Sequence, residues 1–196
     1  MRALSFERAF MAAEHVRGRL HRTTAALDRH GVPYAVIGGH AVAAHVARVD
    51  CDAVRNTNDV DILLRRDDWM QAVSAMQQAG FDAAEVAGIP MFVDRDDPSP
   101  RRGVHVVFAA ERTRANDAHA APDVTDFEVA EEGYRVVNLR ALLIMKLTAF
   151  RRKDQVHVED MLELNMLPRE MVAQLPADLR ARLDEIRASM RPEADG

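Results

Sequence analysis

With 196 residues and a net charge of −5, the chain suits one domain, or one domain with a small appendage, and lacks the overall basic charge of a protein that binds bulk DNA. Cys51 is the only cysteine, which excludes an internal disulfide and a thiolate zinc cluster. The sequence has no uncharged run of about 18 residues that predicts a membrane span, and we therefore expect a cytoplasmic protein without a membrane partner.

The first part of the chain alternates helical and extended patterns. Apolar residues recur at helical spacing from Ser5 to about Arg29, and Gly31 follows as a helix stop. The segment 32–37 then predicts a strand, the Gly38-Gly39 pair a turn, and the segment 40–48 a short buried helix.

The middle of the chain predicts more strands than helices. After the irregular segment 49–58, a second strand is expected over 59–64, and Asp67 or Asp68 is placed to cap a helix that runs to Gln78. Short apolar runs bounded by turn residues predict further strands at 81–86, 90–93, 104–109 and 134–137. The acidic segment 116–132 is expected to form a surface loop or an edge element. This order of elements predicts an α/β (α+β) fold in which helices flank an open mixed sheet.

The last part of the chain is predicted to be helical. Asn138 is placed to cap a helix from Leu139 to about Arg152, whose apolar residues indicate burial. Shorter helices are expected over 156–164 and after Pro168 and Pro176. We therefore divide the chain into an α/β core at 1–137 and a C-terminal helical portion at 138–196, and the apolar helices of this portion could form a surface for a homo-oligomer.

Two carboxylates stand out in the second predicted strand. Side chains alternate across a strand, so Asp59 and Asp61 project from the same face and are close enough to share divalent cations. Ionised carboxylates at this spacing repel one another, and Mg²⁺, a hard ion that takes oxygen ligands, would neutralise them. The pair therefore predicts a metal site.

The strand and Gly38-Gly39 turn, followed by the Asp59-x-Asp61 strand, resemble the signature of the DNA polymerase β-like nucleotidyltransferase superfamily. The resemblance implies that both glycines face nucleotide phosphates and that Asp59 and Asp61 are catalytic ligands of Mg²⁺. The Arg55-x-Thr57-x-Asp59-x-Asp61 arrangement looks more like AbiEii-type toxins and related minimal nucleotidyltransferases, and Thr57 joins the predicted nucleotide-binding residues.

A second constellation lies in the helix predicted after Asn138. In AbiEii-like proteins a lysine on such a helix meets the triphosphate, so the resemblance assigns this role to Lys146, with Arg151 and Lys153 as further candidates. A lysine inside an apolar run must either extend its ammonium to solvent or be used, because burying it unpaired is costly. The alternative is a solvated helix edge on which Asp154 and Asp160 form salt bridges with the basic residues.

The third carboxylate of the polymerase β-like pattern has no clear counterpart. The matching position holds His105, a poor ligand for Mg²⁺ but a good one for softer divalent metals. His105 could instead act as a general base toward an acceptor hydroxyl. Alternatively, it is a structural polar residue and the third ligand comes from one of four carboxylates: Asp94, Asp96, Asp97 or Glu111.

These motifs predict a Mg²⁺-dependent enzyme, with Mn²⁺ as an alternative ion, that moves a nucleoside monophosphate from a nucleoside triphosphate to an acceptor hydroxyl. The acceptor stays open between a small molecule, a protein side chain and an RNA end. A rival interpretation is a degenerate member, related to toxin–antitoxin systems, that binds a nucleotide or a protein partner without catalysis. In that case His105 marks the loss of the third ligand.

Overall fold

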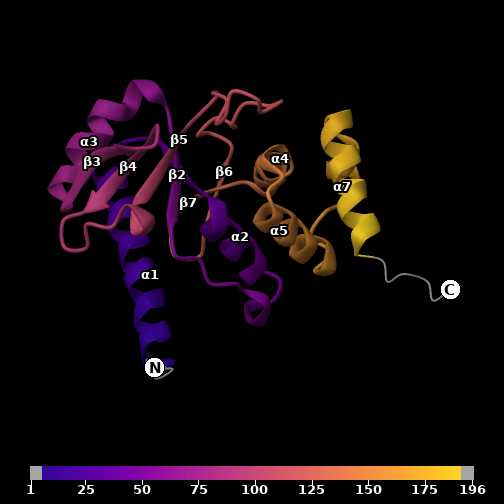
Figure 1. The fold of residues 1–196 in the computed structure, drawn as a ribbon, viewed down its shortest axis with the longest axis horizontal. Coiled ribbons are helices and arrows are strands. Elements are labelled where there is room, and N and C mark those ends of the chain that lie inside the picture. Colours follow the sequence, from indigo (N-terminus) through magenta and orange to yellow (C-terminus); the bar gives the residue numbers. More distant parts are fainter. Residues whose placement is uncertain (1–5, 191–196) are drawn as a thin grey trace.

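The computed structural model describes residues 6–190. Within this range a seven-stranded mixed sheet with the order β3-β4-β5-β2-β1-β7-β6 forms the centre of the molecule (Figure 1). The strands are β1 (Tyr34–Ile37), β2 (Val60–Leu64), β3 (Phe81–Val86), β4 (Ile89–Asp94), β5 (Val104–Phe108), β6 (Phe127–Val129) and β7 (Arg135–Val137). The predicted mixed sheet is confirmed, and the segment predicted as a loop or edge element supplies the edge strand β6.

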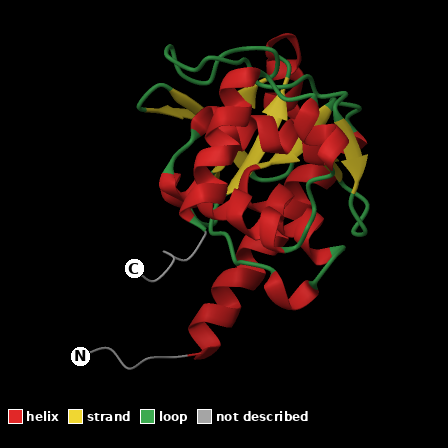
Figure 2. Ribbon diagram, turned by 90° about the vertical axis from the view of Figure 1, so that its right-hand side faces the viewer, coloured by secondary structure: helices red, strands yellow, loops and turns green. Residues whose placement is uncertain are grey.

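Helices pack around this sheet (Figure 2). They are α1 (Phe6–Arg29), α2 (Gly38–Ala47), α3 (Trp69–Gln78), α4 (Leu139–Ala149), α5 (Arg152–Glu163), α6 (Arg169–Ala173) and α7 (Ala177–Ser189). In Figure 1, α1 and α3 lie toward the β3–β5 end of the sheet, and α4, α5 and α7 gather beyond α2 at the other end. No described helix combines the length and the apolar character needed to cross a membrane.

One hydrophobic core joins the sheet to the C-terminal helices. Tyr34, Ile62 and Leu63 on the two central strands are inaccessible to solvent, and so are Leu142 and Leu147 of α4. Full burial of each large apolar side chain contributes about 1.5–3 kcal/mol to the stability of the fold. The C-terminal helices are therefore packed on the sheet as part of the same interior.

The strand pairing decides which polar residues meet. β1 runs antiparallel to β2, and Ile37, the last residue of β1, is opposite Asp61. β5 runs parallel to β2 on its other side, and His105 is opposite Asp61. The turn after β1 and a histidine of β5 therefore lie on either side of the same aspartate.

Several element boundaries differ from the sequence predictions. α1 begins at Phe6, with Ser5 outside the described residues, and α2 begins directly at Gly38. The helix predicted to reach Arg152 ends at Ala149, because Phe150 adopts a left-handed conformation with φ 48°. Such a conformation is uncommon for a non-glycine residue, so the apolar pattern continues across a helix break. Asp68 occupies the cap position of α3, but its side chain makes no capping hydrogen bond.

Candidate active site

The glycine turn packs directly against the acidic strand. Gly38 has φ +69°, and a Cβ atom added to it would lie 2.0 Å from Oδ2 of Asp61. A Cβ atom on Gly39 would lie 2.6 Å from Oγ1 of Thr57. Side chains at either glycine are therefore incompatible with this backbone, and the two motifs of the sequence form one contact surface.

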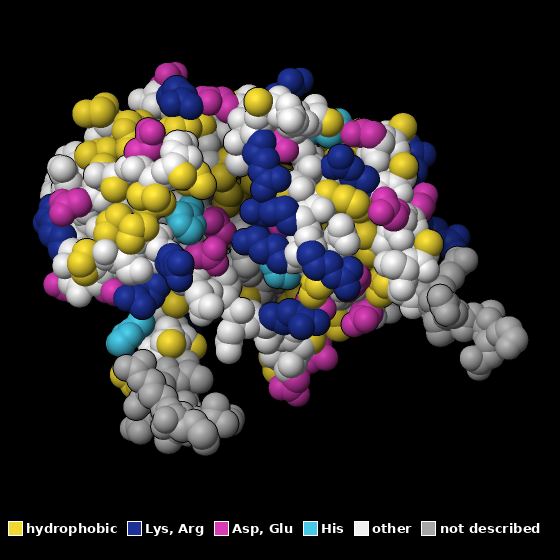
Figure 3. Space-filling model, viewed as in Figure 1, with side chains coloured by type: hydrophobic (Ala, Val, Ile, Leu, Met, Phe, Trp, Pro, Cys, Tyr) yellow, Lys and Arg dark blue, Asp and Glu magenta, His cyan; other side chains and the backbone are white. Residues whose placement is uncertain are grey.

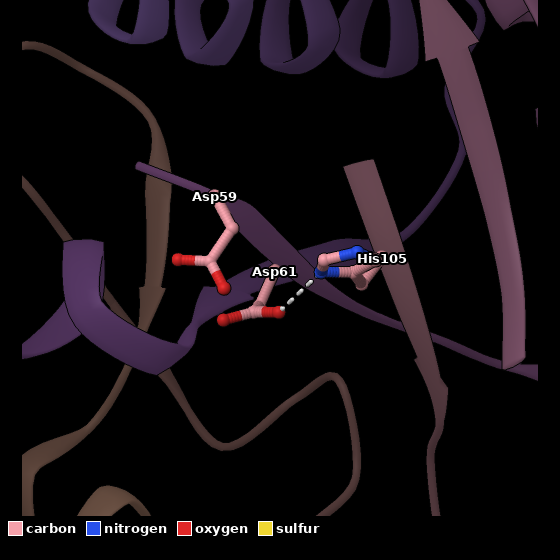
Figure 4. Close-up of side chains that lie close together, drawn as sticks. All are labelled: Asp59, Asp61 and His105. Carbon is pink, nitrogen blue, oxygen red and sulfur yellow. Dashed lines mark hydrogen bonds and ion pairs between the residues drawn. The ribbon is translucent and has the colours of Figure 1, made fainter. Parts of the chain in front are cut away.

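Asp59, Asp61 and His105 form a compact cluster (Figure 4). One ligand atom of each residue lies within 4.8 Å of the others, and all three side chains are half-buried. His105 Nδ1 is 3.3 Å from Oδ1 of Asp61. Thr57 Oγ1 donates a hydrogen bond of 2.9 Å to Oδ1 of Asp59. Two carboxylates and one imidazole thus point into a common space.

The surroundings favour charge in this cluster. Burial opposes ionisation of Asp59, but the hydrogen bond from Thr57 and the charges of Lys153 and His105 outweigh it and lower the pKa of Asp59. The hydrogen bond to Asp61 raises the pKa of His105, against the effect of burial. The surroundings therefore favour an ionised Asp59 and a protonated His105.

His105 is the only third member that the described part of the chain brings to the two aspartates. None of the four carboxylates considered as alternatives joins this cluster. All four form ion pairs with arginines: Asp94 and Asp96 with Arg22, Asp97 with Arg102, and Glu111 with Arg66. The position predicted from the sequence is thus the one that the sheet register places at the site.

The lysine of α4 is buried in a salt bridge. Lys146 is 5% exposed, and its Nζ donates to Oδ1 of Asp154 at 3.1 Å. Arg151 Nε donates to Oδ2 of the same carboxylate at 2.7 Å. Burial lowers the pKa of Lys146, and the Asp154 charge partly offsets this effect. Lys146 therefore reaches the site from the interior of the molecule and not from a solvated helix edge.

Two cavities meet at the aspartates. Both border Asp59, Asp61, Lys146, Arg151 and Lys153. The smaller, about 340 Å³, extends over the glycine turn and is bordered by Gly39, Arg55, Thr57, Arg101 and His157. The larger, about 1100 Å³, extends toward β3–β5 and is bordered by Trp69, Glu85, Phe108, Glu111 and Met145. In Figure 3 acidic side chains lie in a hollow of this face, and a column of Lys and Arg side chains runs beside it.

Two cavity residues, Arg101 and His157, were given no role by sequence reasoning. Arg101 comes from the short helical turn Pro100–Arg102, and its only sequence signal is a basic residue in a polar loop. His157 lies on α5, and its Nδ1 is buried without a hydrogen-bond partner in the described part of the chain. Burial, with a contribution from the charge of Lys146, lowers the pKa of His157 to about 4. His157 is therefore a neutral side chain at the cavity wall.

The mixed sheet flanked by helices is similar in fold to solved nucleotidyltransferase-like structures. A nucleotidyltransferase-like protein from Paracoccidioides brasiliensis is similar, with a TM-score of 0.59 and 14% identity over 90% of this chain and 89% of that one. ANT(2")-Ia in complex with adenylyl-2"-tobramycin has a TM-score of 0.53 and 16% identity over 91% of this chain and 99% of that one. No protein-family model and no curated protein matches the sequence. These similarities establish the fold, and the AbiEii-like branch stays a prediction.

Proposed function

We propose that this protein transfers a nucleoside monophosphate from a nucleoside triphosphate to an acceptor hydroxyl. One observation carries the proposal: Asp59 and Asp61 lie where two cavities meet, beside the cationic side chains of Lys146, Arg151 and Lys153 that border both cavities. Phosphoryl-group transfer needs a cationic cradle for the leaving phosphates and a separate approach for the attacking hydroxyl. This arrangement supplies both.

The smaller cavity is the proposed nucleotide site. Lys146, Arg151 and Lys153 border it on one side, and Gly38 and Gly39 on the other. Lys153 makes no ion pair with any described residue, so its ammonium is free to bind phosphate oxygens. The N-terminus of α2 at the glycine pair adds backbone N–H groups that favour negative charge.

The donor set fits a divalent cation, because two carboxylates and an imidazole are all ligands of such ions in proteins. When bound, Mg²⁺ or Mn²⁺ would neutralise the aspartates and stabilise charge on the reacting phosphate. In the reaction the acceptor oxygen forms a bond to the α-phosphorus. The bond between the α-phosphorus and the oxygen that bridges it to the β-phosphorus breaks. Pyrophosphate leaves, and the hydroxyl proton is released to solvent.

The larger cavity is the proposed acceptor site. Its wall combines apolar side chains such as Trp69 and Phe108 with charges of both signs, including Glu85 and Glu111. The structurally similar ANT(2")-Ia has been seen with adenylyl-2"-tobramycin, a nucleotidylated small molecule. That neighbour is compatible with a small acceptor, and a protein side chain or an RNA end remain the other candidates.

The test is pyrophosphate release from a panel of labelled nucleoside triphosphates, with Mg²⁺ or Mn²⁺ and candidate acceptors. We expect release and label transfer in the wild type and loss of both in Asp61→Asn. Full activity is expected in Asp67→Asn, which changes an exposed aspartate in the short 3-10 helix after β2. Tight nucleotide binding without release under any condition would instead support the degenerate, binding-only alternative. Activity that survives in Asp61→Asn would contradict the proposed site.

A further inference from the structure

The imidazole of His105 lies between two hydrogen-bond acceptors. Its Nε2 is 3.3 Å from the carbonyl oxygen of Pro100, and its Nδ1 is 3.3 Å from Oδ1 of Asp61. A carbonyl oxygen only accepts, so Nε2 must carry the hydrogen of this contact. In a neutral imidazole, Nδ1 then carries no hydrogen, and its lone pair faces the carboxylate of Asp61.

Two lone pairs that face each other require a positive charge between them. A proton on Nδ1 satisfies His105 and Asp61, but it leaves the repulsion between Asp61 and Asp59 in place. A divalent cation reaches all three residues, because their ligand atoms lie within 4.8 Å of one another. Metal-bound histidines commonly donate their second ring N–H to a backbone carbonyl, which is the role that Pro100 takes here.

We propose that Asp59, Asp61 and Nδ1 of His105 together bind one divalent ion that accepts nitrogen ligands, Mn²⁺, Co²⁺ or Zn²⁺, in preference to Mg²⁺. Imidazole suits borderline ions such as Zn²⁺, and Mn²⁺, although it favours oxygen ligands, accepts a nitrogen ligand more readily than Mg²⁺, which binds oxygen ligands almost exclusively. The inference deepens the proposed function, since it concerns the same site. It rests on metal binding alone, however, and is tested without nucleotide.

The carbonyl that orients His105 is fixed by a clamp on the loop before β5. Arg102 Nε donates to Oδ2 of Asp97 at 2.7 Å, and Arg19 of α1 donates to the same carboxylate at 3.2 Å. Arg19 is 3% exposed, so this anchor lies inside the fold. Arg102 and Asp97 are thus positioning residues for the metal ligand, acting through Pro100.

The first test measures which atoms bind Mn²⁺. Pulsed electron paramagnetic resonance of the Mn²⁺-loaded, tag-free protein is expected to show coupling to a ¹⁴N nucleus in the wild type and none in His105→Asp. In titration calorimetry, His105→Asp should lower the ratio of Mn²⁺ to Mg²⁺ affinity about tenfold or more, because an oxygen ligand replaces nitrogen. Thermal unfolding checks that the variant is folded.

Three results would overturn the inference: no ¹⁴N coupling in the wild type, coupling that survives in His105→Asp, or a Mg²⁺ affinity equal to that for Mn²⁺. Failure of the proposed function is a separate result. It would appear as absent pyrophosphate release even when the nitrogen coupling is present.

The clamp has its own matched control. Arg102→Gln should weaken Mn²⁺ binding about tenfold, as expected for loss of an outer-sphere partner, and change the ¹⁴N coupling. Arg95, on the same loop, forms a similar pair with Asp82 of β3 and not with Asp97. Arg95→Gln should therefore leave the Mn²⁺ affinity and the ¹⁴N coupling unchanged. Equal effects of the two substitutions would exclude a positioning role for Arg102.

Discussion

Replacing Gly38 with alanine tests the contact on which the candidate site depends. The new Cβ atom would lie 2.0 Å from Oδ2, 2.8 Å from Cγ and 2.9 Å from Cβ of Asp61. Rotating the aspartate side chain relieves the first two contacts but not the third, because Cβ does not move with χ1. The backbone of β1 or β2 must therefore shift.

The magnitude has two parts. The left-handed conformation at φ +69° costs an alanine about 1–2 kcal/mol. Displacing a packed strand is an overpacking effect that typically costs a further 1–3 kcal/mol. Gly31→Ala isolates the first part, because Gly31 has a similar φ of +64° and open space around its Cβ position. We expect Gly38→Ala to lose roughly 2–5 kcal/mol of unfolding free energy and Gly31→Ala about 1–2 kcal/mol.

Chemical denaturation of both variants measures these losses, and calorimetric titration with Mn²⁺ measures the site. Gly38→Ala should lose metal affinity because Asp61 is displaced, whereas Gly31→Ala, at the end of α1, should bind metal as the wild type does. Equal destabilisation of the two variants, or unchanged metal affinity in Gly38→Ala, would refute the close packing of the glycine turn against Asp61.

Three further predictions concern stability. Lys146→Met should lower the free energy of unfolding by roughly 3 kcal/mol in denaturation experiments, because it removes one buried partner of Asp154. Lys153 is exposed, so Lys153→Met should change this free energy by less than about 0.5 kcal/mol. Similar losses in the two variants would contradict the buried pair of Lys146 and Asp154. The pKa of His157 is lowered to about 4, so as the pH falls the unfolded chain binds a proton at this side chain before the folded chain does. The free energy of unfolding is therefore highest above about pH 6.5 and falls by on the order of 1–3 kcal/mol toward pH 4. His157→Gln should flatten this dependence of stability on pH, and an unchanged slope would contradict the role of His157. Asn138→Ala should cost about 1 kcal/mol, because Oδ1 of Asn138 accepts from the first turn of α4 at 2.9 Å; no loss by thermal unfolding would exclude capping.

The parts of the structure that sequence reasoning reached are those set by local periodicity. Alternation along β2 predicted that Asp59 and Asp61 share a face, and the two residues do lie in one cluster. His105 was assigned by the resemblance to the polymerase β-like pattern and not by local periodicity, and the strand register places it opposite Asp61. Local pattern therefore located the acidic cluster before any tertiary information.

Features that depend on long-range packing were out of reach. Salt bridges between Asp154 and the basic residues were one of the alternatives, but the break at Phe150 that lets α5 turn back toward Lys146 was not expected, because nothing in the apolar pattern marks a left-handed residue there. Arg55 was expected only as part of a motif, yet it binds Asp160 of α5 at 2.7 Å. Arg101 reaches the cavity from a loop whose path is set by ion pairs to α1. Arg55 and Asp160 are 105 residues apart in the sequence and Arg19 and Asp97 are 78 apart, and a local pattern carries no signal of such partners.

The structure adds a second reason for the glycine pair. The resemblance to nucleotidyltransferases implies that Gly38 and Gly39 admit nucleotide phosphates, and that role belongs to the proposed function. Independently of any ligand, the missing side chains let Thr57 and Asp61 approach the first turn of α2. The same turn that would bind phosphate therefore also holds the side chain of Asp61 beside the start of α2. Gly38 and Asp61 therefore act as one unit, and a substitution at either position is expected to disturb the other.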